Sequence, residues 1–97
     1  MRDHKKFMQI VSQVEKIGNK LGAKPTPKAA DKAIAKLIKK KTELKRLKST
    51  PLTAVFAENL DIYIAALKQA KEGNNRAAEK LLKTARRNWA EFLRGCK

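Results

Sequence analysis

The sequence predicts an all-α protein, a small three- to four-helix bundle whose last two helices form an antiparallel hairpin. Apolar residues recur at steps of three and four along most of the chain, as on the buried face of an α-helix. Interruptions that contain Gly or Pro, at residues 22–27, 48–51 and 72–75, separate the helical segments. β-branched residues are scattered and form no alternating run of the length that a strand requires. The predicted helices span residues 3–21, 27–47, 51–72 and 75–94 of one domain, residues 1–97.

Capping residues mark the expected ends of the helices. Asp3 is the expected N-cap of the first helix, and Gly22 is its expected stop. The pairs Thr26-Pro27 and Thr50-Pro51 predict the next two starts, because Thr caps a helix and Pro fits its first position without wasting an amide proton. The last helix is expected to begin at Asn74 or Asn75.

The helix expected at residues 51–72 is the predicted centre of the core. Its apolar residues cover more than half of its circumference, which is typical of a helix buried on two sides. A second copy of the chain is an alternative cover for this broad face, so a homo-oligomer stays open. The short connection at residues 72–75 makes the last helix its antiparallel neighbour.

The end of the second predicted helix is charged on nearly all sides. Lys41, Lys45 and Lys48 lie on the side that is apolar earlier in the helix. We therefore expect the last turns of this helix to project beyond the core.

The net charge of +15, from 24 Lys and Arg against 9 Asp and Glu, is the feature that indicates function. A chain this basic repels itself, and an anionic partner relieves the repulsion. Residues 24–48 hold ten cations against two acids, a net of +8, and residues 74–97 have a net of +5. Residues 51–72 have a net of −1, so the positive charge belongs to two regions on either side of a nearly neutral helix.

Nucleic-acid binding through the phosphate backbone is the leading hypothesis. Lys outnumbers Arg by 18 to 6. Lys binds phosphates as a point charge, whereas Arg can also form bidentate hydrogen bonds to the edge of guanine. This ratio favours weak sequence specificity. The expected contacts follow helical spacing on the second and fourth helices: Lys28, Lys32, Lys36, Lys39, Lys40, Arg46, Lys80, Lys83, Arg87 and Arg94.

A second hypothesis belongs to another class of protein. A small basic adaptor or inhibitor, of the phage or mobile-element type, would dock on an acidic surface of a larger protein such as a nucleic-acid-processing enzyme. Interface energy concentrates in a few aromatic and Arg anchors. The candidates are Arg86, Trp89, Phe92 and Pro51, although the register of the last helix also places Trp89 and Phe92 on its apolar side. An anionic membrane surface ranks last, because the second helix has no aromatic anchor.

Catalytic chemistry is not expected. His4 is the only histidine, and a lone histidine cannot build a zinc site, so no metal and no cofactor are predicted. Glu58 and Asp61 lie three residues apart on one helix, where carboxylates more often pair with Lys than act as acid and base. No small-molecule substrate is expected. The single cysteine, Cys96, predicts a packing role or an incidental thiol, and the absence of a long apolar run predicts a cytoplasmic protein.

Overall fold

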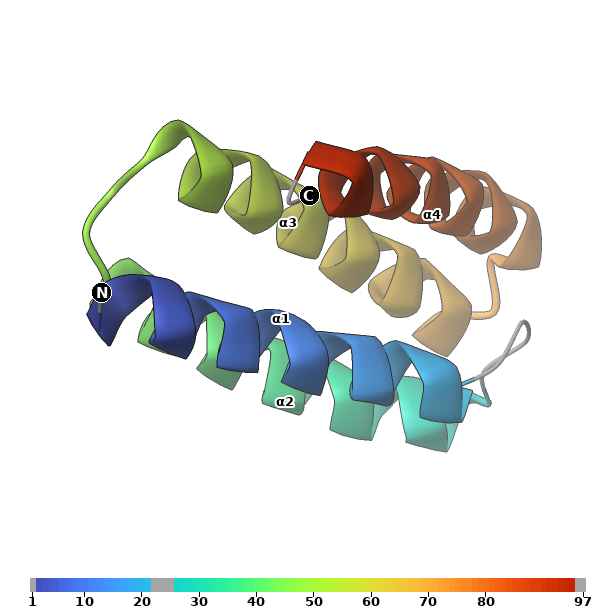
Figure 1. The fold of residues 1–97 in the computed structure, drawn as a ribbon. Coiled ribbons are helices and arrows are strands. Elements are labelled where there is room, and N and C mark those ends of the chain that lie inside the picture. The colour runs from blue at the N-terminus through green and yellow to red at the C-terminus, as the bar shows by residue number, and fades with distance from the viewer. Residues whose placement is uncertain (1, 22–25, 96–97) are drawn as a thin grey trace.

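The computed structural model describes residues 2–21 and 26–95 and consists of helices packed side by side (Figure 1). The helices are α1 (Arg2–Leu21), α2 (Pro27–Lys45), α3 (Pro51–Lys71) and α4 (Asn75–Gly95). The all-α prediction is confirmed, and every expected helix end lies within two residues of the observed one. Because α1 already begins at Arg2, Asp3 is not its N-cap. The predicted stop at Gly22 and the thiol of Cys96 lie outside the described residues.

Both Thr-Pro pairs start a helix as predicted. The hydroxyl oxygen of Thr26 accepts a hydrogen bond from the backbone N–H of Ala29 at 3.2 Å. Thr50 and Thr53 cap each other reciprocally: the Thr53 N–H donates to Thr50 Oγ1 at 3.1 Å, and the Thr50 N–H donates to Thr53 Oγ1 at 2.9 Å. Each cap satisfies backbone donors that the first turn leaves unpaired.

The turn between α3 and α4 is closed by glycine and asparagine. Gly73 has a φ of 85°, a left-handed conformation that favours Gly at the end of a helix. Asn74 precedes α4, and its side-chain amide donates to Gln69 Oε1 at 2.9 Å, back on α3. These contacts make the two helices the antiparallel hairpin that the sequence predicts.

Helix α3 lies at the centre of the packing, as expected. It packs against both α2 and α4, while α1 packs against α2. Its residues Phe56, Leu60 and Leu67 are almost completely buried. Neighbouring helices contribute further apolar side chains to the same core, among them Ala30 and Leu37 of α2. Among the residues whose side chains the structure describes, Asn59 is the buried polar one, and it is 5% exposed.

An aromatic cluster holds α1 against the α3–α4 hairpin. The ring of Phe7 in α1 stands edge-on to Phe56 and Phe92, with centroids 5.5 and 5.9 Å away. Trp89 continues the cluster, 5.5 Å from Phe56. Such edge and tilted arrangements add about 0.5–1.5 kcal/mol per pair to the burial of apolar area. The cluster fixes the N-terminal half of α1 against the hairpin.

The end of α2 does not project beyond the core, contrary to the sequence-based expectation. Leu44 is 4% exposed, and Leu47 packs against the core just after the helix. Lys41 instead reaches across to an ion pair with Asp61 of α3, and Lys40 pairs with Glu43 at 3.0 Å. A long Lys side chain covers apolar surface with its stem and places its ammonium group at the edge, so cations on this side are compatible with burial.

None of the helices in the described ranges has the length and apolar character needed to cross a membrane.

Candidate nucleic-acid interface

The predicted phosphate contacts are almost all exposed. On α2 and just after it, Lys28, Lys32, Lys36, Lys39 and Arg46 are exposed, as are Lys80, Lys83, Arg87 and Arg94 on α4. Lys40 is the exception: it is partly buried, and its ammonium group is engaged by Glu43. Nine of the ten predicted cations are therefore exposed, and Lys40 is partly buried in an ion pair.

A lysine-lined groove runs between the second half of α1 and the first half of α2. Its volume is about 440 Å³. Lys16 and Lys20 line it from α1, and Lys32 and Lys36 line it from α2. The other lining residues are Ile17, Asn19, Leu21, Ala29 and Ala33. We call this feature the lysine groove; no acidic side chain lies among its described lining residues.

Helical spacing explains why the lysines stand together. Residues four apart lie on the same side of a helix, so Lys16 and Lys20 share one flank of α1, and Lys32 and Lys36 share one flank of α2. Packing α1 against α2 brings the two flanks to one groove. The small side chains of Ala29 and Ala33 leave the floor of the groove low.

Sequence reasoning found Lys32 and Lys36 but missed Lys16 and Lys20. The sequence does contain a signal for these two residues: Lys16 and Lys20 are four positions apart, and each is followed by an apolar residue, Ile17 and Leu21. What periodicity does not supply is the identity of the helix that packs beside this flank.

Asp31 and Asp61 are engaged with lysines that do not line the groove, whereas Glu15, next to Lys16 in α1, lines the cleft on the other side of this helix. Asp31 accepts a hydrogen bond from Lys71 of α3 at 2.7 Å, and Asp61 pairs with Lys41. Within the described part of the chain, none of the groove lysines takes part in an ion pair. The repulsion that the sequence predicts along α2 is therefore partly relieved, but only for the lysines outside the groove.

Near the other end of α2, a lysine contact lowers the pKa of Glu43. The ammonium group of Lys40, 3.0 Å from the carboxylate, holds the pKa of Glu43 below its ordinary 4.5, and the charges of Lys39 and Lys6 act in the same direction. Lys6 belongs to α1, so charges of both helices contribute to the lowered pKa.

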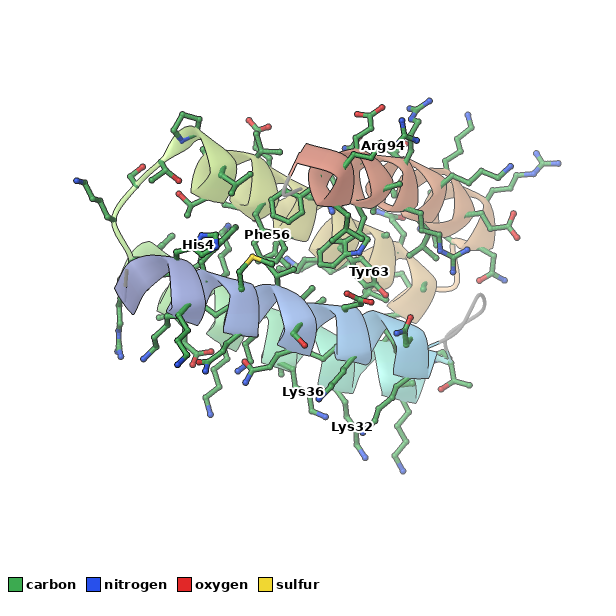
Figure 2. All side chains as sticks on the ribbon, in the orientation of Figure 1. His4, Lys32, Lys36, Phe56, Tyr63 and Arg94 are labelled. Atoms are coloured by element: carbon green, nitrogen blue, oxygen red, sulfur yellow. The ribbon has the colours of Figure 1, made fainter. Side chains whose placement is uncertain are left out.

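A second basic surface lies on α4. At 100° per residue, Lys80, Lys83 and Arg87 fall within a sector of about 60°, and Arg76 and Arg94 share that sector. We call these five residues the α4 surface. Glu91 is also exposed on this side and lowers its net charge. Figure 2 shows Arg94 on the side of the bundle opposite to Lys32 and Lys36.

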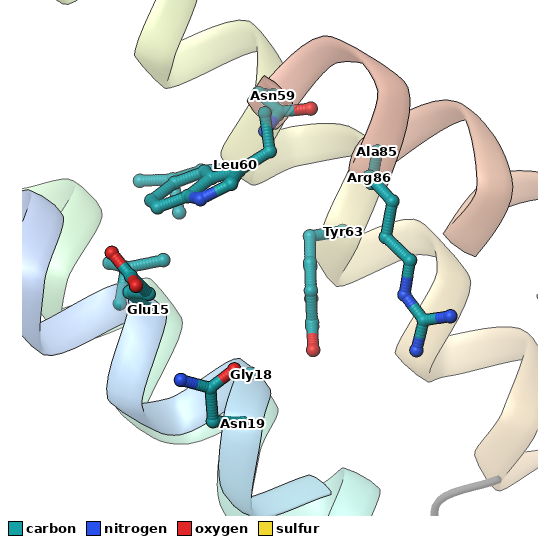
Figure 3. Close-up of a pocket in the computed structure, with 10 residues that line it drawn as sticks. Glu15, Gly18, Asn19, Asn59, Leu60, Tyr63, Ala85 and Arg86 are labelled. Atoms are coloured by element: carbon teal, nitrogen blue, oxygen red, sulfur yellow. The ribbon is translucent and has the colours of Figure 1, made fainter. Parts of the chain in front are cut away.

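An apolar cleft lies on the other side of α1, between α1, α3 and α4 (Figure 3). Its volume is about 340 Å³, and its walls include Val14, Leu60 and Trp89. Figure 3 shows the Tyr63 ring standing between Arg86 and the α1 residues of the cleft. Burial raises the pKa of the Tyr63 hydroxyl above its ordinary 10.0, with the charge of Arg86 opposing the rise.

One buried polar atom at this cleft is unsatisfied. Asn59 lines the cleft, and its Oδ1 is enclosed without a hydrogen-bond partner among the described residues. On the opposite wall, Gly18 approaches so closely that an added Cβ would stand 3.3 Å from the Tyr63 hydroxyl oxygen.

The residues predicted for protein docking do not form one exposed patch. Phe92 is 5% exposed and belongs to the aromatic cluster, which removes it from the candidate anchors. Trp89 is partly buried and lines the cleft with the exposed Arg86. Pro51 is exposed at the first position of α3 and does not line the cleft. Arg86 and Trp89 are thus the pair that the structure brings together.

The described residues contain no cluster of His, Cys, Asp and Glu side chains that could hold a metal ion. His4 is exposed on α1. Comparison with protein-family models finds no match to the chain, and comparisons with curated proteins and with solved structures also find none.

Proposed function

We propose that this protein binds nucleic acid through the phosphate backbone and that the lysine groove is its main contact. The observation that supports the proposal is the convergence of four lysines from two helices on one open groove with no acid among its described lining residues. Glu43, Asp61 and Asp31 form ion pairs with Lys40, Lys41 and Lys71, none of which lines the groove. Ammonium groups without an acidic partner, gathered on one surface, attract the closely spaced charges of a phosphate backbone.

The chemistry of the groove favours attraction over base recognition. Its cations are all lysines, which bind phosphate as point charges and do not form the bidentate hydrogen bonds of arginine. Asn19 is the one lining side chain whose amide could pair with a base edge. We therefore expect similar affinity for unrelated sequences, because contacts to phosphate position a nucleic acid without distinguishing its bases.

Salt dependence follows from the number of phosphate contacts. Four contacts, one for each groove lysine, give a slope of about −3.6 for log K against log salt, so that affinity falls roughly 150-fold between 50 and 200 mM. With Lys28 and Lys39 included, six contacts predict a loss of about 10³-fold over the same range. Fluorescence anisotropy of a labelled duplex at several salt concentrations measures this slope directly.

A pair of charge-matched variants tests the position of the site. The groove variant, K20Q/K32Q/K36Q, removes three positive charges from the groove, while the control variant, K5Q/K45Q/K68Q, removes three exposed lysines that do not line it. We expect the groove variant to bind at least about 30-fold more weakly at 0.1 M salt and the control variant to lose only a few-fold. Equal losses would mean that total charge, and not the groove, determines binding.

The apolar cleft supports a second candidate, docking on a larger protein. Trp89 and Arg86, the residue types that dominate interface energies, meet at its rim. On this hypothesis a stoichiometric partner survives nuclease treatment of the sample and is lost from an Arg86→Glu variant. On the nucleic-acid hypothesis, nuclease treatment removes the bound material and Arg86→Glu has little effect.

A further inference from the structure

We infer that the protein holds two nucleic-acid segments at once, one in the lysine groove and one on the α4 surface. The inference rests on the proposed function and extends it from binding to bridging. Its starting point is the placement of the two basic surfaces, which Figure 2 shows on opposite sides of the bundle through Lys32, Lys36 and Arg94.

A helix without net charge separates the two basic surfaces. Helix α3 packs between α2 and α4 and holds two lysines against two acids, a net charge of zero. By the same count α2 has seven lysines against two acids, a net of +5, and α4 has six cations against two acids, a net of +4. Helix α1 has five cations against two acids, a net of +3, and supplies Lys16 and Lys20 to the groove. Two basic surfaces thus lie on either side of α3, which has no net charge.

The two surfaces are electrostatically independent at physiological salt. The shorter dimensions of the bundle are 23 and 19 Å between Cα atoms. The Debye length is about 8 Å at 0.15 M ionic strength, so a polyanion on one side leaves the charge on the other side uncompensated. Binding at the groove consequently does not satisfy Lys80, Lys83 and Arg87.

One duplex cannot reach both surfaces. The longest dimension of the bundle is 42 Å, whereas the persistence length of duplex DNA is about 500 Å. Wrapping a duplex from the groove to the opposite side would require a bend far sharper than a few cations can stabilise. The uncompensated surface is instead satisfied by a second segment, which gives a complex of one protein with two duplexes.

Energy transfer between two duplexes tests the inference. Two unlinked duplexes of about 20 bp, well below the persistence length, are labelled with a donor and an acceptor fluorophore and mixed with the 97-residue chain. We expect energy transfer to rise as protein is added and to fall again in excess protein, when each duplex binds its own molecules. Anisotropy of each single duplex is recorded in the same solutions.

Three variants of identical net charge distinguish bridging from aggregation. The α4 variant, K80Q/K83Q/R87Q, and the groove variant should each keep single-duplex binding in weakened form and lose at least three-quarters of the energy transfer. The control variant, K5Q/K45Q/K68Q, should keep both signals.

Anisotropy changes without energy transfer in the wild type would overturn bridging and leave the proposed function standing. Energy transfer that persists in the α4 variant would also overturn it, since self-association of groove-bound copies then accounts for the signal. No anisotropy change at all would contradict the proposed function itself.

Discussion

The two hollows on either side of α1 differ in what their walls are made of. The lysine groove is lined by four lysines and has no acid among its described lining residues, whereas the apolar cleft is lined by aromatic and branched side chains, by one acid and one arginine, and by the enclosed, unsatisfied amide of Asn59. One helix supplies a wall to both, because Lys16 and Lys20 face one side while Val14 and Gly18 face the other. Changes at the groove should therefore affect binding with little effect on folding, and changes at the cleft should do the reverse.

The largest change in stability is expected from a substitution of Phe56 in the aromatic cluster. Phe56 is fully buried and contacts Phe7, Trp89 and Phe92, so Phe56→Ala should destabilise the fold by about 3–5 kcal/mol. Urea unfolding followed by circular dichroism measures the change. Val55→Ala, at a side chain that is 49% exposed, is the control and should change stability by less than about 1 kcal/mol. Similar effects of the two substitutions would contradict the assignment of the core.

The unsatisfied amide of the cleft predicts a stabilising substitution. Asn59→Leu replaces an enclosed acceptor that has no partner among the described residues with an apolar group of similar size. Removing its desolvation penalty should raise stability by about 1–2 kcal/mol. A thermal melt compares the variant with Asn59→Asp, which buries a charge at the same place and should lower stability. A loss of stability in Asn59→Leu would show that the amide is hydrogen-bonded after all.

A smaller effect is expected at the start of α3, away from both hollows. Thr50→Ala removes the Thr50 side-chain contact of the capping box and should cost about 1 kcal/mol, because the backbone N–H of Thr53 loses its acceptor. Thr42, whose hydroxyl only donates to the Ile38 carbonyl in the middle of α2, provides the control: Thr42→Ala should be nearly neutral. The denaturant midpoints of Thr50→Ala and Thr42→Ala measure the two effects. Equal midpoints would contradict a stabilising role of the Thr50 cap.

The smallest effect concerns the titration of Tyr63. Burial raises its pKa above 10.0, so the folded state prefers the protonated hydroxyl. The associated stability is complete below the unfolded pKa of about 10 and is lost as pH rises through the folded value. Because Tyr63 is the single tyrosine of the chain, tyrosinate absorbance reports it alone. A midpoint at or below that of the urea-unfolded protein would contradict the buried environment.

Local patterns in the sequence predict most of the fold. Apolar spacing places the helices, and the Thr26 and Thr50 caps start α2 and α3 where expected. The exposure of Lys32 and Lys36 follows from the same spacing. The groove itself does not, because it depends on which flank of α1 turns toward α2. The pairing of Lys41 with Asp61 is likewise a tertiary contact, and no pattern along α2 alone indicates it.

The most direct test of the lysine groove is footprinting of lysine amines with and without a duplex. An amine-acylating reagent and mass spectrometry report the reactivity of each lysine in the intact protein. We predict that the duplex protects Lys16, Lys20, Lys32 and Lys36 strongly, while Lys5 and Lys68 keep their reactivity, because only the first group lines the groove. Protection spread equally over both groups, or absent from the groove, would contradict the assignment of this site.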